Sequence, residues 1–173
     1  MTTTTLGVVI TVPSPWREVL ARWRERVGDA AEIRIPPHVT LLPPTEVPVA
    51  LLPRIDEHLA ATAAEHPPFE IHLSGTGTFR PVSDVVFVAV AAGIAQCEQL
   101  ERRVRSGPLH RQTRFPYHPH VTVAHDIPRE GLDEAYEGLA AFEARFPATG
   151  FTAFEQETGG VWAVRKDFAL GGS

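Results

Sequence analysis

Two four-residue stretches of the chain hold the residue types needed for acid–base chemistry. Each stretch reads Pro-His-Val-Thr, first over residues 37–40 and again over residues 119–122. Because residues i and i+2 of a β-strand point to the same face, each stretch directs one imidazole and one hydroxyl to the same side. Two such strands facing each other would bring four side chains into one cleft: His38, Thr40, His120 and Thr122.

This set of side chains suits phosphodiester chemistry. One neutral imidazole can take a proton from an attacking water or hydroxyl, while a second, protonated imidazole gives a proton to the leaving oxygen. The ordinary histidine pKa of about 6.5 allows this near neutral pH without a metal ion. A threonine hydroxyl can donate a hydrogen bond to a non-bridging phosphate oxygen, where negative charge grows in the transition state. The residues therefore favour opening or forming a 2′,3′-cyclic phosphate over acyl transfer.

The elements that must position these residues occur twice in the same order. Apolar periodicity and turn residues predict a strand, a helix, a His-x-Thr strand, a helix and two strands in each half, with the strand over 84–91 shared. We expect an α+β fold in which residues 1–173 form a single compact domain. It would consist of two pseudo-symmetric lobes, about 1–83 and 84–173, with exchange of strands possible. Each lobe would be an antiparallel-rich sheet with helices on its outer face, and the active-site groove would lie between the lobes.

Local signals set the limits of the expected elements. Ser14 is expected to cap the first helix, and a short strand is expected over 32–35. The Pro43-Pro44 pair is expected to end the first His-x-Thr strand. The fourth helix should run from Leu132 to Phe142 and end before Pro147, and Gly159-Gly160 should turn the last hairpin.

Composition restricts the class of protein. The longest apolar run, over 85–95, is too short for a membrane span, and the first residues lack the positive charge of a signal peptide. The single cysteine, Cys97, fits a reducing compartment, so we expect a soluble cytoplasmic protein. The net charge of −5 argues against coating long nucleic acid. We expect a monomer with no obligate protein partner.

The motifs and their surroundings resemble the 2H phosphoesterase superfamily over roughly residues 6–168. Residues 115–124, which read Phe-Pro-Tyr-His-Pro-His-Val-Thr-Val-Ala, are similar to the second motif of its bacterial 2′-5′ RNA ligase-like and cyclic phosphodiesterase branch. Residues 77–80 resemble the middle segment of that branch. The resemblance implies a metal-independent hydrolase, without a cofactor, that acts on 2′,3′-cyclic phosphate RNA ends or small cyclic nucleotides. It also implies that His38 and His120 are catalytic, and that Thr40 and Thr122 bind phosphate.

Two other functions and one other chemistry share parts of this pattern. The same residues could support RNA 2′-5′ ligase activity, or a non-catalytic module that binds a nucleotide. A metal site is suggested superficially by His118 and His120 followed by His125-Asp126, but a binuclear pattern would require Asp and His at positions 122 and 123. Those positions are threonine and valine, so the sequence predicts no metal.

Residues beside the second motif are the candidates for holding a nucleotide or RNA end. No acidic residue occurs between Arg102 and His125, whereas five arginines do, which indicates a phosphate-steering patch or a solvated loop. Aromatic rings could stack on an unpaired base. At His125, many relatives carry an arginine or an aromatic residue. The candidate substrate-binding residues are Arg114, Phe115, Tyr117, His118, His125 and Trp162.

Overall fold

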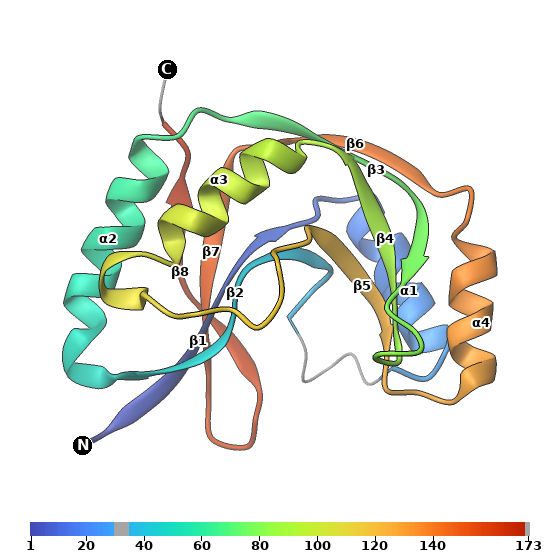
Figure 1. The fold of residues 1–173 in the computed structure, drawn as a ribbon, viewed down its shortest axis with the longest axis horizontal. Helices are drawn as coiled ribbons and strands as arrows, with labels where there is room; N and C mark the ends of the chain where they lie inside the picture. The colour runs from blue at the N-terminus through green and yellow to red at the C-terminus, as the bar shows by residue number, and fades with distance from the viewer. Residues whose placement is uncertain (30–34, 172–173) are drawn as a thin grey trace.

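Eight β-strands form one antiparallel sheet in the computed structural model, which describes residues 1–29 and 35–171. The strand order is β6-β3-β4-β5-β2-β1-β7-β8 (Figure 1). The strands are β1 (Thr3–Thr11), β2 (His38–Pro48), β3 (Phe69–Thr78), β4 (Val85–Ala92), β5 (His120–His125), β6 (Glu143–Ala148), β7 (Gly150–Gln156) and β8 (Trp162–Ala169). The helices are α1 (Trp16–Arg26), α2 (Leu52–Ala64), α3 (Ile94–Val104) and α4 (Arg129–Gly138), with short 3-10 turns at Val49–Leu51 and Gly107–Leu109.

The sheet has two four-stranded halves that meet at the two His-x-Thr strands. One half is β6-β3-β4-β5 and the other is β2-β1-β7-β8. Between them the register contains a single pair, Val39 with Val121, the middle residues of the two motifs. Each half mixes strands of the two expected lobes, because β7 and β8 join β1 and β2, and β3 joins β4, β5 and β6. The expected α+β fold with antiparallel sheets is confirmed. The two units are interleaved, and the lobe limit near residue 83 stays a prediction.

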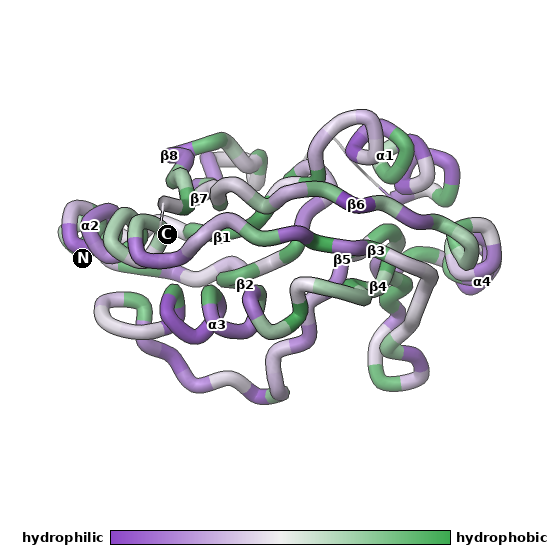
Figure 2. Tube along the Cα trace, turned by 90° about the horizontal axis from the view of Figure 1, so that it is seen from above, coloured by the Kyte–Doolittle hydropathy of each residue, from purple (hydrophilic) through white to green (hydrophobic). Residues whose placement is uncertain are grey.

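The helices also cross from one unit to the other. The helix that precedes each motif packs on the motif strand of the other unit: α1 precedes β2 and packs on β5, whereas α3 precedes β5 and packs on β2. Seen from above, α1 and α3 lie on opposite sides of the row of strands, with α2 and α4 at its two ends (Figure 2). None of the helices in the described ranges is long and apolar enough to cross a membrane.

Alternation along the motif strands separates the core from the site. Val39 and Val121 are fully buried, whereas the flanking histidines and threonines are only partly buried. One large apolar cluster includes both valines together with Leu41, Val123 and residues of all four helices. Cys97 lies in this cluster, as its helical position predicted. Burial of the motif valines fixes which face of each strand the imidazoles use.

Several expected element limits are wrong, and prolines explain two of them. Strand β2 continues through Pro43-Pro44 to Pro48. On one edge, the register of β2 with β1 shifts between Leu6 and Val8, and this irregularity accommodates both prolines. On the other edge, β2 pairs with no residue of β5 beyond Val39, so no backbone donor is needed there. Strand β6 was not expected, and it contains Pro147, which was expected to follow the fourth helix. The proline is tolerated because β6 is an edge strand whose outer side needs no donor.

Two helix limits also differ from expectation. Helix α4 ends at Gly138, before Phe142. Ser14 does not cap α1: its hydroxyl donates a 2.5 Å hydrogen bond to the Glu18 carboxylate, and the cap position is Pro15. The strand expected over 32–35 falls largely outside the described residues, and Ile35 belongs to no strand. The hairpin at Gly159-Gly160 is confirmed, with both glycines at positive φ.

Candidate active site

The antiparallel pairing of Val39 with Val121 brings the two motifs face to face. Around this pair the register sets His38 across from Thr122, and Thr40 across from His120. All four side chains leave the strands on the face opposite the buried valines. Each threonine hydroxyl therefore stands beside the imidazole of the other motif, a relation that a single motif cannot produce.

Both imidazoles are held in the same orientation by the backbone. The Nδ1 atom of His38 lies 2.7 Å from the carbonyl oxygen of Pro36, and that of His120 lies 2.5 Å from the carbonyl oxygen of His118. A carbonyl can only accept, so each Nδ1 carries a hydrogen and donates it. In the neutral ring Nε2 is then the basic atom, and in the protonated ring it is the acid that can be offered to substrate.

Two cavities meet at Thr40, which lines both. The first holds about 170 Å³, and its lining includes His38, Thr122 and Trp162. The second holds about 610 Å³ and is lined by His120 and His118, by Phe79, and by the segment that precedes the second motif. The candidate site is therefore a groove with a small compartment beside His38 and a large, mostly apolar one beside His120.

Burial lowers the pKa of both histidines. The pKa of His38 is lowered to about 4, chiefly by burial; the hydrogen bond to Pro36 opposes the shift, and the charges of Arg24 and His120 add to it. For His120, burial lowers the pKa, the hydrogen bond to His118 opposes the effect, and His118 adds to the lowering. Without substrate both rings therefore favour the neutral form near pH 7.

Aromatic rings form the wall behind His120. The rings of Phe79 and Phe87 each lie 5.1 Å from the His120 ring, centroid to centroid. The His118 ring lies 5.5 Å from His120 and also contacts both phenylalanines. Gly77 makes room for this wall, because a Cβ there would lie 2.5 Å from the Phe87 ring. These packed rings restrict His120 to few orientations.

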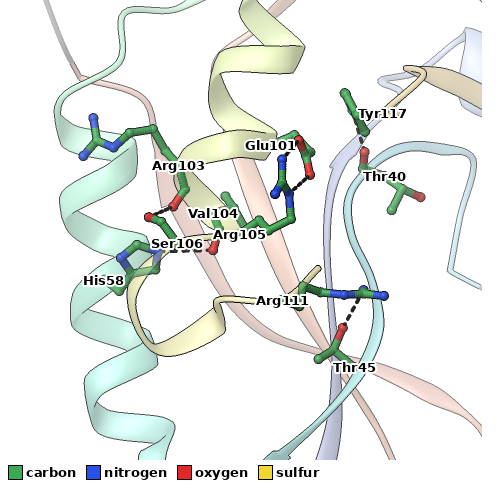
Figure 3. Close-up of polar contacts among 10 residues, drawn as sticks. All are labelled: Thr40, Thr45, His58, Glu101, Arg103, Val104, Arg105, Ser106, Arg111 and Tyr117. Carbon is green, nitrogen blue, oxygen red and sulfur yellow. Dashed lines mark hydrogen bonds and ion pairs between the residues drawn. The ribbon is translucent and has the colours of Figure 1, made fainter. Parts of the chain in front are cut away.

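The segment before the second motif, residues 110–119, lies over the large cavity and is fastened to β2. We call it the strap. The Tyr117 hydroxyl donates a 2.7 Å hydrogen bond to the carbonyl of Thr40, and Arg111 Nη1 lies 3.2 Å from the Thr45 hydroxyl (Figure 3). Arg114 lies over the ring of Phe115, whose side chain is 67% exposed. The strap thus turns basic and aromatic groups toward the cavity that holds His120.

The basic segment is divided by its ion pairs. Arg103 pairs with Glu65, so its charge is largely neutralised. Arg105 is neutralised in the same way by Glu101 (Figure 3). Arg111 and Arg114 instead line the large cavity. The positive charge that this basic segment turns toward the large cavity therefore comes from the strap.

Most of the candidate residues predicted from the sequence converge on the groove. Arg114, Phe115, Tyr117 and His118 line the large cavity, and Trp162 lines the small one. His125 stands at the far end of β5 from His120, where its Nε2 lies 3.2 Å from Asp126, and it lines neither cavity.

Sequence reasoning missed two features of the site. One is the pair of carbonyls that orient the imidazoles, for which the proline before each motif was the available signal. The other is Arg24, a buried arginine of α1 that lines the small cavity with His38. In the ranges that the structure describes, no group of three or more His, Cys, Asp or Glu side chains is placed to hold a metal ion.

Comparisons with known proteins agree with this geometry. The family model described as the 2′-5′ RNA ligase superfamily matches residues 11–163. The chain is 29% identical over 168 residues to "Putative phosphoesterase GK0864" of Geobacillus kaustophilus, with 96% of each chain covered. It is 27% identical over 173 residues to a protein of the same description from Bacillus thuringiensis, again with 96% of each covered.

Solved structures share the fold along nearly the whole chain. The apo structure of E. coli LigT superposes with a TM-score of 0.72 at 22% identity, covering 98% of this chain and 99% of that one. The structure of TT0787 from Thermus thermophilus gives a TM-score of 0.67 at 25% identity, with the same coverage. With duplicated motifs, an interleaved sheet and a family match over most of its length, the chain belongs to the 2′-5′ RNA ligase superfamily, the 2H phosphoesterases that its motifs resemble.

Proposed function

We propose that the protein is a metal-independent phosphodiesterase that opens 2′,3′-cyclic phosphates, at RNA ends or in small cyclic nucleotides, by two-histidine acid–base catalysis. The observation that carries the proposal is the matched pair of imidazoles. Each is held through Nδ1 by a backbone carbonyl, and each stands across the strand pair from a threonine of the other motif. This arrangement leaves two Nε2 atoms and two hydroxyls for one phosphate group.

The reaction needs one proton to move at each histidine. A water oxygen attacks phosphorus while the Nε2 atom of the neutral imidazole takes the water proton. The bond from phosphorus to one ribose oxygen breaks, and the protonated imidazole gives its Nε2 hydrogen to that oxygen. The product is a phosphate monoester beside a free hydroxyl. Exchange with solvent then restores the two protonation states, while Thr40 and Thr122 donate to the non-bridging oxygens.

The difference between the two compartments supports an assignment of the base and the acid. The small cavity beside His38 has room for water but not for a nucleoside, whereas the large one beside His120 falls in the range of small-molecule sites. His38 also has the pKa that is lowered to about 4. We therefore assign His38 as the base that activates water, and His120 as the acid that protonates the ribose oxygen.

Known ligands of a protein with this fold fit the proposal. E. coli LigT has been crystallised with 3′-AMP and with phosphate. A nucleoside monophosphate is the class of product that opening of a cyclic nucleotide would leave in the groove. For this chain, the rings and arginines of the strap are the groups that would hold the nucleoside.

The test is hydrolysis of 2′,3′-cyclic AMP, and of an RNA ending in a cyclic phosphate, in buffer containing a chelator. We expect His38→Ala and His120→Ala each to lower kcat by a factor of about 10³. His66→Ala, a change at a histidine away from the groove, should leave kcat unchanged. Full activity in both groove variants would exclude the mechanism. Tight nucleotide binding without turnover in the wild type would favour the non-catalytic binding module.

The assignment of base and acid has its own test. A nucleoside 2′,3′-cyclic phosphorothiolate, with sulfur in place of the bridging ribose oxygen, keeps water as the attacking group and carries a thiolate leaving group that needs no proton. We expect His120→Ala to retain the wild-type rate on this ester within about tenfold, while His38→Ala stays strongly impaired. The opposite pattern would reverse the assignment and leave the two-histidine mechanism standing.

Ligase activity is the second candidate, because the family is described as 2′-5′ RNA ligases. The same groups would serve if an RNA hydroxyl replaced water as the attacking group. Adding an RNA with a free 5′-hydroxyl to the cyclic phosphate assay tests it directly. A joined product that disappears with His38→Ala would support the activity, and hydrolysis alone would exclude it under those conditions.

A further inference from the structure

Arg24 is a buried cation in the wall of the small cavity. It lies in the last turn of α1, its side chain is 5% exposed, and it lines the cavity together with His38 and Thr122. Arginine is rarely buried to this extent unless it holds a defined partner, because removing its charge from water is costly. We therefore expect the Arg24 side chain to hold a defined partner at this position.

The guanidinium contacts the backbone immediately before the first motif. Its Nη1 atom donates a 3.0 Å hydrogen bond to the carbonyl of Ile35. The next residue, Pro36, supplies the carbonyl that accepts from Nδ1 of His38. Arg24 thus holds the chain one residue from the atom that orients the His38 ring, so a shift of the guanidinium would be transmitted to that ring.

The charge of Arg24 acts on His38 as well. Among the residues that the structure describes, the charged or titratable groups around the ring are Arg24 from α1, Asp29 after α1, and His120 from β5. Among these, Arg24 and His120 lower the pKa of His38. A cation close to the ring opposes its protonation and so keeps Nε2 available as a base.

The equivalent helix of the second unit carries a buried residue of the opposite charge. Helix α3 stands before β5 as α1 stands before β2, and its buried charged residue is Glu101, which is 5% exposed. Glu101 lines the large cavity with His120 and pairs with Arg105 at 2.6 Å. The duplicated site therefore has a buried cation beside one histidine and a buried anion on the side of the other.

We propose that Arg24 is a positioning residue that fixes the segment before His38 and keeps its ring neutral, so that the first motif is the base side of the site. Arg24 does this through its hydrogen bond to the Ile35 carbonyl and through its charge. The inference rests on the proposed function only where it assigns the first motif as the base side of the site. The state of His38 can be measured with no substrate present.

The first experiment is a titration of the histidine ring Cε1–H signals by NMR in the free protein. In Arg24→Gln we expect the His38 pKa to rise by about 1, as for loss of a nearby cation, and that of His120 to stay within about 0.3 of wild type. Arg22→Gln is the matched control, since it removes the same charge from an exposed position of α1 and should move neither pKa.

The second experiment is the pH profile of kcat/KM on 2′,3′-cyclic AMP. Its acid limb reports the base of the free enzyme, so Arg24→Gln should move that limb to higher pH by the same amount. Arg24→Lys keeps the charge and loses the guanidinium fork. We expect it to keep the His38 pKa near wild type and to lower kcat about tenfold.

The outcomes separate this inference from the proposed function. An inactive wild type would refute the function, and the NMR titration would still test the effect of Arg24. An unchanged His38 pKa in folded Arg24→Gln would overturn the electrostatic role. If Arg24→Gln does not fold, Arg24→Lys decides: a His38 pKa near the ordinary value of about 6.5 overturns the electrostatic role, and a wild-type kcat overturns the positioning role.

Discussion

At the scale of single residues, the site depends on what holds each imidazole. His38 and His120 both donate through Nδ1 to a carbonyl two residues earlier. Each carbonyl belongs to the residue before the proline of the motif. A proline restricts the backbone of the residue that precedes it, which helps to present this carbonyl to the imidazole. The two rings therefore have equivalent tautomers in unequal surroundings, and we propose that the surroundings give them different tasks.

The threonine hydroxyls should act mainly on the transition state. We expect Thr122→Val to lower kcat on a cyclic phosphate by a factor of about 10 to 100 with little change in KM, because the hydroxyl donates where charge grows. Thr122→Ser keeps the hydroxyl and should stay within a few-fold of wild type. Steady-state kinetics of both variants checks this, and equal losses in the two would point to packing of the methyl group instead.

The lowered pKa of His38 should appear in the stability of the protein. The pKa is about 4 in the folded state, below the ordinary value near 6.5, so between these values the unfolded chain binds a proton that the folded chain does not. The free energy of unfolding must then fall as the pH falls through this window. Stability from this group is complete above about pH 6.5 and is lost toward pH 4.

Replacing His38 removes this dependence. Between pH 7 and pH 4.5 the wild type should lose about 1 to 2 kcal/mol more stability than His38→Gln, less than the full pKa difference implies because the ring is partly exposed. Urea unfolding of both proteins at the two pH values measures the difference. His66→Gln serves as the control at a histidine away from the groove. Parallel losses in the wild type and His38→Gln would contradict the pKa shift.

Arg24 could not be identified as a residue of the site from the sequence alone. A helix with scattered arginines is typical of a solvated face, and periodicity does not reveal which arginine turns inward. Its role depends on α1 crossing to the other unit, which is a tertiary feature. The motif residues could be predicted, by contrast, because two matched settings within a duplication identify each other.

At the scale of elements, prediction succeeded where apolar periodicity was strong and failed where proline was treated as a stop. Strand β4 lies within one residue of its expected limits, 84–91. Strand β2 runs past Pro43-Pro44, and β6 contains Pro147. Proline prevents one donor from joining a ladder, and it ends a strand only if that donor was needed. Whether it was needed depends on which edges are paired, and a single sequence does not state this.

We expect the strap to be the element most directly involved in substrate binding. Tyr117 joins it to β2 through the carbonyl of Thr40, so Tyr117→Phe should loosen the roof of the large cavity. We expect KM for 2′,3′-cyclic AMP to rise several-fold and stability to fall by about 1 kcal/mol, the usual value of one such hydrogen bond. Steady-state kinetics and urea unfolding measure the two effects.

The chain offers a matched control for this variant. Tyr136, the other of its two tyrosines, lies on α4 and is 39% exposed, so Tyr136→Phe should change neither KM nor stability. An unchanged KM in Tyr117→Phe would mean that the strap holds its place without this bond.

At the scale of the whole molecule, the edges of the sheet bear on assembly. Edge strand β6 carries Pro147 together with outward-facing charged residues, and edge strand β8 carries the run Arg165-Lys166-Asp167. Proline and charge on an edge discourage pairing with a second sheet. We expect a monomer, with a mass of 19.0 kDa by light scattering after size exclusion. A stable dimer at micromolar concentration would contradict this.

The pairing of Val39 with Val121 has a consequence for ancestry. The two valines stand where the pseudo-two-fold axis crosses the sheet, and the helix before each motif covers the strand of the other unit. A chain carrying one copy of this unit could complete the groove only beside a second copy, because a two-fold interface brings the same residue of both partners to the axis. The present groove has the geometry of a symmetric homodimer fused into one chain. After such a fusion, each copy could vary alone, and a cation could arise beside one histidine and an anion beside the other.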